Sequence, residues 1–127
     1  MSSSSSSASG SLQELTTTFT KLQTQYTTLI EARQRLDSQL SENVQVQKEF
    51  KGLKEENQVY KLIGPVLMKV EQVEARGNVD KRIEYIRGEI KRVEQQIAEV
   101  GGQTESKRMQ IIKLQQEQQR SAAGAAG

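Results

Sequence analysis

The chain has 127 residues, of which 34% are hydrophobic and 4% are aromatic. Typical compact domains are about 45–50% apolar, so this chain is not expected to bury a large core of its own. Disorder and a long helical protein with a narrow apolar stripe both fit that composition. The 18 basic and 16 acidic residues nearly cancel, which favours the helical alternative. The net charge of +2 gives no electrostatic basis for binding nucleic acid or an anionic membrane.

The first part of the chain predicts a flexible tail followed by a long helix. Residues 1–10 are serine-rich and of low complexity, as in flexible segments. A helix is predicted over 11–57, because Ser11 and Glu14 have the spacing of a capping box and Asn57 is a plausible stop. Within it, apolar residues recur every three or four positions, the coiled-coil period: Leu12, Leu15, Phe19, Leu22, Tyr26, Leu29, Leu36 and Leu40.

The middle of the chain predicts a β-hairpin over 58–71. Two runs of β-prone residues flank the Gly64-Pro65 pair. Gly64 supplies the positive φ that the first position of a II′ turn requires, and the fixed φ of Pro65 suits the second position. Because side chains alternate across a strand, Val59, Lys61, Ile63, Val66, Met68 and Val70 share one face, and Tyr60, Leu62, Leu67 and Lys69 share the other.

Both faces of this hairpin are mostly apolar, and both of its edges carry unpaired backbone groups. An isolated two-stranded hairpin is marginal in water. We therefore predict that strands of other chains cover it, with assembly through Val59, Tyr60, Leu62, Ile63, Gly64, Pro65, Val66, Leu67, Met68 and Val70. The alternative is a monomer in which the hairpin folds against the ends of its own helices.

A second helix is predicted over 78–120, followed by a small-residue tail over 121–127. Asn78 is the expected N-cap, although the helix could begin a turn earlier, near Glu74. The same coiled-coil period places Val79, Ile83, Ile86, Ile90, Val93, Ile97, Val100, Ile111 and Leu114 on one side of the helix. Two helices of similar length with one connection are expected to fold back on each other. With these ends, the numbers of facing residues add up to about 136, and Arg33 lies level with Gly101 and Gly102.

The sequence gives no sign of catalysis or of a cofactor. It contains no histidine and no cysteine, and no Gly-rich phosphate loop, metal-ligand cluster or nucleophile elbow. No apolar run approaches the roughly 20 residues that span a bilayer, and no secretion signal precedes the helix. The expectation is a non-enzymatic protein of the cytoplasm or the nucleus, with the cytoplasm preferred, that binds no cofactor, metal, nucleic acid or membrane.

The run from Val59 to Lys69, together with residues 74–76 and 78–86, resembles the central signature of prefoldin β-class subunits, most closely those of the eukaryotic complex. Residues 31–36 and 39–43 also match, and the resemblance covers about 12–120. It implies a mainly α fold: a long antiparallel two-helix coiled coil with one β-hairpin at the connection. A single hairpin marks the β class.

The resemblance also implies a function and a set of partners. Prefoldin is a hexamer of two α and four β subunits, whose hairpins assemble into a platform that carries the coiled coils. It captures unfolded clients such as actin and tubulin without ATP and passes them to the cytosolic chaperonin. Client contact is expected near the free helix ends, at Leu12, Leu15, Phe19, Leu22, Ile111, Ile112 and Leu114. A generic coiled-coil scaffold or tether is the alternative function.

Overall fold

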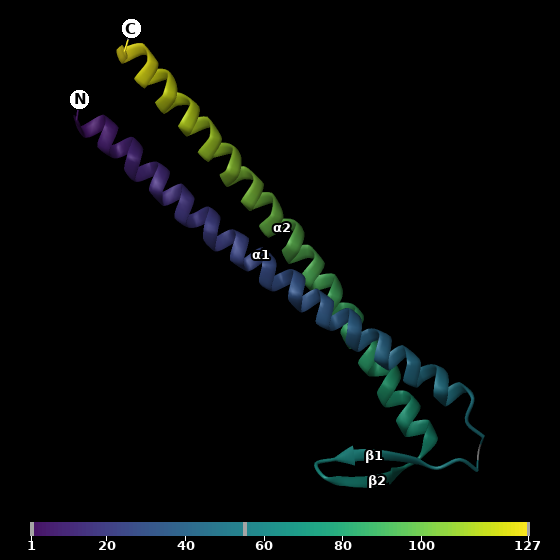
Figure 1. The fold of residues 1–127 in the computed structure, drawn as a ribbon. Helices are drawn as coiled ribbons and strands as arrows, with labels where there is room; N and C mark the ends of the chain where they lie inside the picture. The colour runs from purple at the N-terminus through teal and green to yellow at the C-terminus, as the bar shows by residue number, and fades with distance from the viewer. Residues whose placement is uncertain (1, 55, 127) are drawn as a thin grey trace. The chain divides into compact units, whose positions relative to one another are not determined.

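The computed structural model describes residues 2–54 and 56–126. The elements follow in the order α1 (Ser2–Lys51), β1 (Val59–Ile63), β2 (Val66–Val70) and α2 (Gln72–Ala126) (Figure 1). The predicted fold class, two long helices joined by one antiparallel hairpin, is confirmed. The chain forms two compact units. We call residues 32–94 the hairpin unit, and residues 2–31 together with 95–126 the terminal unit.

Helix α1 has different ends from those predicted. It begins at Ser2 rather than at residue 11, so Ser11 and Glu14 lie inside the helix. Extending an existing helix requires no new nucleus, and this lets it continue past a capping signal. It ends at Lys51 rather than at residue 57, where the amides of Gly52 and Leu53 donate to carbonyls three residues back. Met1 of the predicted tail and Glu55 of the predicted helix lie outside the described residues.

Helix α2 also exceeds its predicted range. It begins at Gln72 rather than at residue 78, and the amide of Ala75 donates to the carbonyl of Glu71 at 2.9 Å. Asn78 is therefore inside the helix and is not its N-cap. The helix continues to Ala126 rather than ending at residue 120, and Gly127 lies outside the described residues. That residues 2–10 and 121–126 fray in solution stays a prediction, since terminal turns open at the lowest free energy.

The hairpin has the predicted register and turn. Strands β1 and β2 pair antiparallel, with Val59 opposite Val70 and Ile63 opposite Val66. Gly64 has a φ of 58°, the left-handed value that the sequence required of this position. The cross-strand pairs place Tyr60 opposite Lys69 and leave Lys61 and Met68 together on the other face, as predicted.

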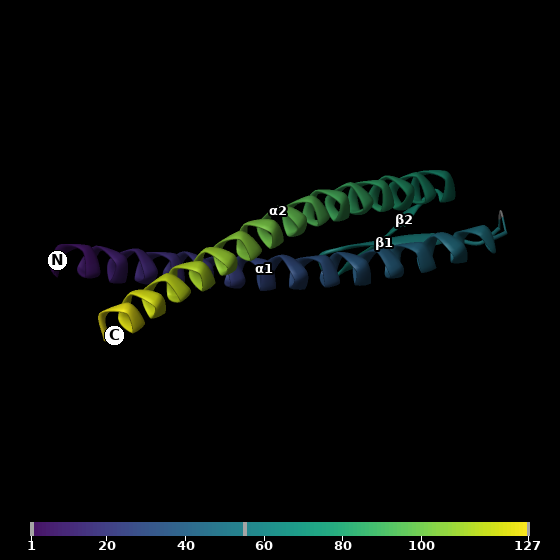
Figure 2. The same cartoon turned by 90° about the horizontal axis from the view of Figure 1, so that it is seen from above.

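In the hairpin unit, residues 32–51 of α1 run beside residues 72–94 of α2 in the opposite direction (Figures 1 and 2). The core of this unit is one side of α2, the side that the coiled-coil period predicted. Ile83, Ile86 and Val93 are almost fully buried, together with Ala75. The seam residues of α1 that face them are half-buried.

Two polar contacts fix the register of the hairpin unit. Arg33 binds Glu94 at 2.8 Å, and the Gln47 side-chain amide donates to Asp80 at 2.9 Å. In both pairs the residue numbers add up to 127, so the predicted value of 136 is wrong. The error comes from the predicted helix ends, because α1 stops earlier and α2 starts earlier than capping signals suggested.

The terminal unit packs more loosely. Most of its seam residues on both helices are half-buried, Tyr26 is 39% exposed, and none of the described side chains in this unit is fully buried. Tyr26 packs its ring against Gly101, where an added Cβ would lie 3.4 Å from the ring. Gly101 therefore faces Tyr26, and the predicted pairing of Arg33 with the glycines is wrong. The absence of a fully buried residue leaves this seam easier to open than that of the hairpin unit.

Two glycine substitutions are expected to act in opposite directions on stability. At Gly102, inside α2, an added Cβ would meet open space. Gly102→Ala should therefore raise the free energy of unfolding by about 0.5–1 kcal/mol, through helix propensity alone. At Gly64 the φ of 58° opposes a Cβ, so Gly64→Ala should cost about 1–2 kcal/mol of hairpin stability. Thermal unfolding by circular dichroism and amide exchange in the strands measure the two effects. A destabilising Gly102→Ala would contradict the open position of that residue.

Candidate functional site

The exposed hairpin is the most unusual surface of the hairpin unit. Six of its apolar side chains are more than half exposed: Tyr60, Leu62, Ile63, Val66, Leu67 and Met68. Only Val59 and Val70, where the strands meet the helix ends, are half-buried. Gly64 and Pro65 form the exposed turn. Apart from its base, the described hairpin does not pack against its own helices, as the monomeric alternative required. Its two apolar faces remain uncovered by the described residues.

The hairpin is the whole sheet. Within the described residues the sheet has two strands, so the outer edges of β1 and β2 both lack a neighbouring strand. Unpaired edges of this kind are templates for strands of another chain. The uncovered faces and open edges lie within residues 59–70, the segment that contains all ten residues predicted from the sequence for assembly.

Side chains from the start of α2 hold the base of the hairpin. The Gln72 side-chain amide donates to the carbonyls of Lys54 and Asn57, both at 2.6 Å. The Arg76 guanidinium donates to the carbonyl of Phe50 at 2.8 Å, which satisfies a carbonyl in the last turn of α1. Asn57 accepts a hydrogen bond from the Lys54 amide at 2.7 Å, so it closes the connecting turn and does not end the helix.

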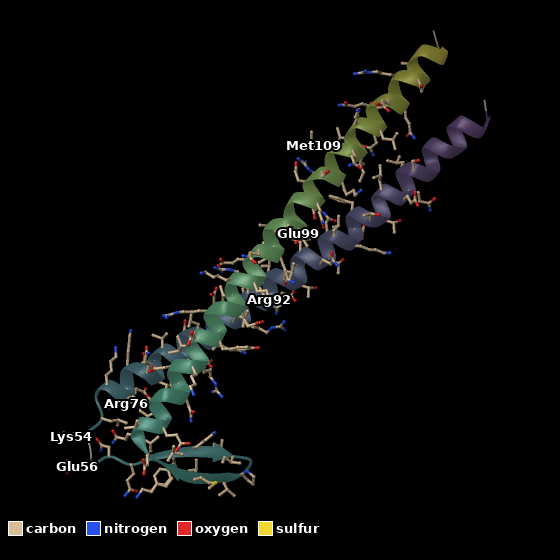
Figure 3. All side chains as sticks on the ribbon, turned by 180° about the vertical axis from the view of Figure 1, so that it is seen from behind. Lys54, Glu56, Arg76, Arg92, Glu99 and Met109 are labelled. Carbon is tan, nitrogen blue, oxygen red and sulfur yellow. The ribbon has the colours of Figure 1, made fainter. Side chains whose placement is uncertain are left out.

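The residues predicted to contact clients lie in the terminal unit. Six of them are half-buried in its seam: Leu12, Leu15, Phe19, Leu22, Ile111 and Leu114. Ile112 lies beside the seam and is 36% exposed. Sequence reasoning missed Met109, which is 56% exposed on α2 (Figure 3) and three positions before Ile112 on the same side of the helix. Its spacing of three from Ile112 is the signal that could have identified an apolar pair outside the seam.

The charged groups form ordinary surface pairs. The hydrogen bond from Arg92 lowers the pKa of Glu89, and the hydrogen bond from Arg108 lowers the pKa of Glu105. The hydrogen bond to Glu94 raises the pKa of Arg33. These partners are solvent-exposed pairs on helix surfaces, which contribute little to stability.

The described residues contain neither a candidate metal site nor a membrane-spanning helix. No three or more Asp or Glu side chains gather where they could hold a metal ion. No helix in residues 2–54 or 56–126 is long and apolar enough to cross a membrane.

Two helices, one exposed hairpin and a loosely packed terminal seam define a class of protein, and comparison with known proteins identifies it. The sequence pattern described as "Prefoldin subunit" matches residues 13–118. The chain belongs to the prefoldin family, a family of non-enzymatic chaperone subunits.

Individual relatives show which member of the prefoldin family the chain is similar to. Prefoldin subunit 6 of Saccharomyces cerevisiae is 47% identical over 103 residues, covering 81% of this chain and 90% of the relative. Prefoldin subunit 6 of Homo sapiens is 44% identical over 109 residues, covering 86% of this chain and 84% of the relative. The expected similarity to a eukaryotic β-class subunit is thus confirmed as a similarity to subunit 6.

Solved structures support the fold. The prefoldin β subunit from Thermococcus strain KS-1 superposes with a TM-score of 0.73 at 20% identity, covering 80% of this chain and 89% of that one. The β2 subunit from the same strain gives a TM-score of 0.63 at 18% identity. Both structures bear out the β-type architecture with its single hairpin.

Proposed function

We propose that this chain is a β-type subunit of a hexameric prefoldin co-chaperone in the cytoplasm. The complex would contain two α and four β subunits, hold unfolded polypeptides such as actin and tubulin chains without ATP, and deliver them to the cytosolic chaperonin. The observation that carries this proposal is the hairpin, whose two apolar faces and two open edges are uncovered in the single chain.

Burial of the hairpin supplies the driving force for assembly. Each exposed large apolar side chain gains about 1.5–3 kcal/mol when it leaves water. Burying the exposed parts of six such side chains favours association, and pairing of the strand edges adds directional hydrogen bonds. A scaffold or tether built from an uninterrupted helix would not expose such a hairpin, and residues 59–63 and 66–70 are strands rather than helix.

The terminal unit suits transient binding of clients. Its seam lacks a fully buried residue among those described, so local opening offers Leu12, Leu15, Phe19, Leu22, Ile111 and Leu114 at low cost. Ile112 and Met109 are available without opening. A single unit of this kind binds weakly, and several units on one platform gain affinity through effective concentration.

Reconstitution tests the proposal. The purified chain is mixed with the other prefoldin α and β subunits, and the mass of the product is measured by light scattering. Chemically denatured actin is then diluted into a solution of the assembled complex, and aggregation of the actin is followed by turbidity. The expected results are a hexamer that contains this chain and suppressed aggregation in the absence of ATP. A chain that stays monomeric with every partner subunit would refute the proposal.

A further inference from the structure

A hollow of about 250 Å³ lies within the hairpin unit, where the base of the hairpin meets the ends of the helices. Its walls are about equally polar and apolar and come from all four elements, and the apolar part includes Val46 and Phe50 from α1, Val59 from β1, Val70 from β2 and Val79 from α2. Pockets for small-molecule ligands usually measure about 300–1,000 Å³. The size of this hollow suits one large side chain better than a cofactor.

The charges around the hollow have one sign. Lys61 from β1 and Arg82 from α2 both line it, and none of the lining residues that the structure describes carries a carboxylate. Within residues 2–54 and 56–126, neither cation has a carboxylate at salt-bridge distance, whereas Arg33, Arg92 and Arg108 are each paired. Two cations beside an apolar hollow favour an occupant that combines an apolar side chain with a negative charge.

The position of the hollow identifies the source of that occupant. Val59 and Val70 line it and also begin and end the exposed hairpin, so the hollow is continuous with the surface proposed for assembly. A strand added to either edge of the hairpin would bring its flanking residues to this point. A neighbouring subunit is therefore better placed to fill it than a client held at the terminal unit.

We propose that this hollow receives one apolar side chain of an adjacent prefoldin subunit, next to an aspartate or glutamate of that subunit which pairs with Lys61 and Arg82. The inference rests on the proposed assembly through the hairpin and adds the chemistry by which a particular neighbour is recognised. Apolar contact supplies affinity, and the carboxylate excludes subunits that carry a neutral or basic residue at that place.

Charge reversal tests the electrostatic half. The variant Lys61→Glu with Arg82→Glu is compared with Lys69→Glu with Lys81→Glu, which changes the net charge equally. Lys69 is the cross-strand partner of Tyr60 and lies on the face of the hairpin that does not carry Lys61. Lys81 is exposed on α2. Neither Lys69 nor Lys81 lines the hollow. Titration with the partner subunits, followed by native mass spectrometry, should show at least about tenfold weaker association for the first variant only. Equal behaviour of the two variants would overturn the proposal.

Two further measurements separate the outcomes. Val46→Trp enlarges a partly exposed side chain that lines the hollow and should weaken association without reversing a charge, and circular dichroism checks that the helices remain. In the wild-type complex, carbodiimide should join Lys61, and not Lys69, to a carboxylate of a neighbouring subunit. Absence of that crosslink would contradict the proposed pairing of Lys61 with a carboxylate of the neighbouring subunit. A wild-type chain that joins no partner would refute the proposed function and this inference together, whereas wild-type assembly with an unaffected Lys61→Glu, Arg82→Glu variant refutes the inference alone.

Discussion

Replacing Ile63 by lysine and Val66 by glutamate is expected to abolish incorporation of the chain into the hexamer while leaving its helix content unchanged. These two residues face each other beside the turn, and both are more than half exposed. Because each is only about half exposed in the single chain, removing them from an interface forfeits about 1.5–3 kcal/mol of apolar burial, a loss of at least about tenfold in association, and burial of the two introduced charges adds a further cost. Opposite charges are used because like charges on paired positions would disrupt the hairpin itself.

The measurement is light-scattering mass after mixing with partner subunits, with circular dichroism of each chain alone. The matched control is Tyr85→Lys with Met109→Glu, which also removes two exposed apolar residues and introduces the same two charges. Neither control residue is in the hairpin, so the control should assemble normally. Assembly of the Ile63→Lys, Val66→Glu variant would contradict the role of the hairpin, and failure of both variants would point to a general effect of lost apolar surface.

Deleting residues 1–22 together with residues 106–127 should leave assembly intact and weaken client capture. The cut follows the observed register, in which Tyr26 lies against Gly101. It removes every residue predicted to contact clients, together with Met109, and leaves the buried core around Ile83, Ile86 and Val93 untouched. We expect the concentration of complex needed to halve actin aggregation to rise by about tenfold, since the complex loses one of its linked binding surfaces.

A shorter deletion serves as its control. Removing residues 1–9 and 119–127 leaves Leu12, Leu15, Ile111 and Leu114 in place, so suppression of aggregation should stay close to that of the full chain. If the longer deletion left suppression of actin aggregation unchanged, the terminal unit would not be a client-binding site. The proposed role of the hairpin in assembly would be unaffected. Loss of the hexamer after the longer deletion would instead show that this unit contributes to assembly.

The hairpin could be predicted from sequence because its signals are local. The Gly64-Pro65 pair fixes the turn, alternation fixes the two faces, and both follow from neighbours a few positions apart. The seam of α2 was predictable for the same reason, since a period of three and four residues is visible in the sequence itself.

The helix ends could not be predicted because they depend on contacts between distant residues. Asn57 was interpreted as a stop, yet α1 ends at Lys51, and Arg76 binds the Phe50 carbonyl from the other helix. No local pattern connects positions that are 26 residues apart. The register error followed directly, because it was calculated from the predicted ends.

The hollow at the base of the hairpin was invisible to sequence reasoning for a related cause. Lys61 belongs to a strand pattern and Arg82 to a helix pattern. Taken separately, each pattern predicts only an exposed positive charge. Only the fold brings both beside Phe50 and Val79. The exposure of Met109 and Ile112 is easier to predict from the sequence, because both apolar residues fall outside the otherwise regular seam period of their helix.

The bonds from Gln72 and Arg76 to the carbonyls of Lys54, Asn57 and Phe50 have a consequence for engineering and for evolution. They close the segment from Phe50 to Arg76 on itself, so its ends are anchored by its own side chains. We expect such a segment to keep its fold when it is grafted between two other antiparallel helices, although Val46, Val79 and Arg82 of the hollow lie outside it and would have to be grafted as well. New members of a hetero-oligomer can arise in this way, by exchanging the connector while the helices diverge independently.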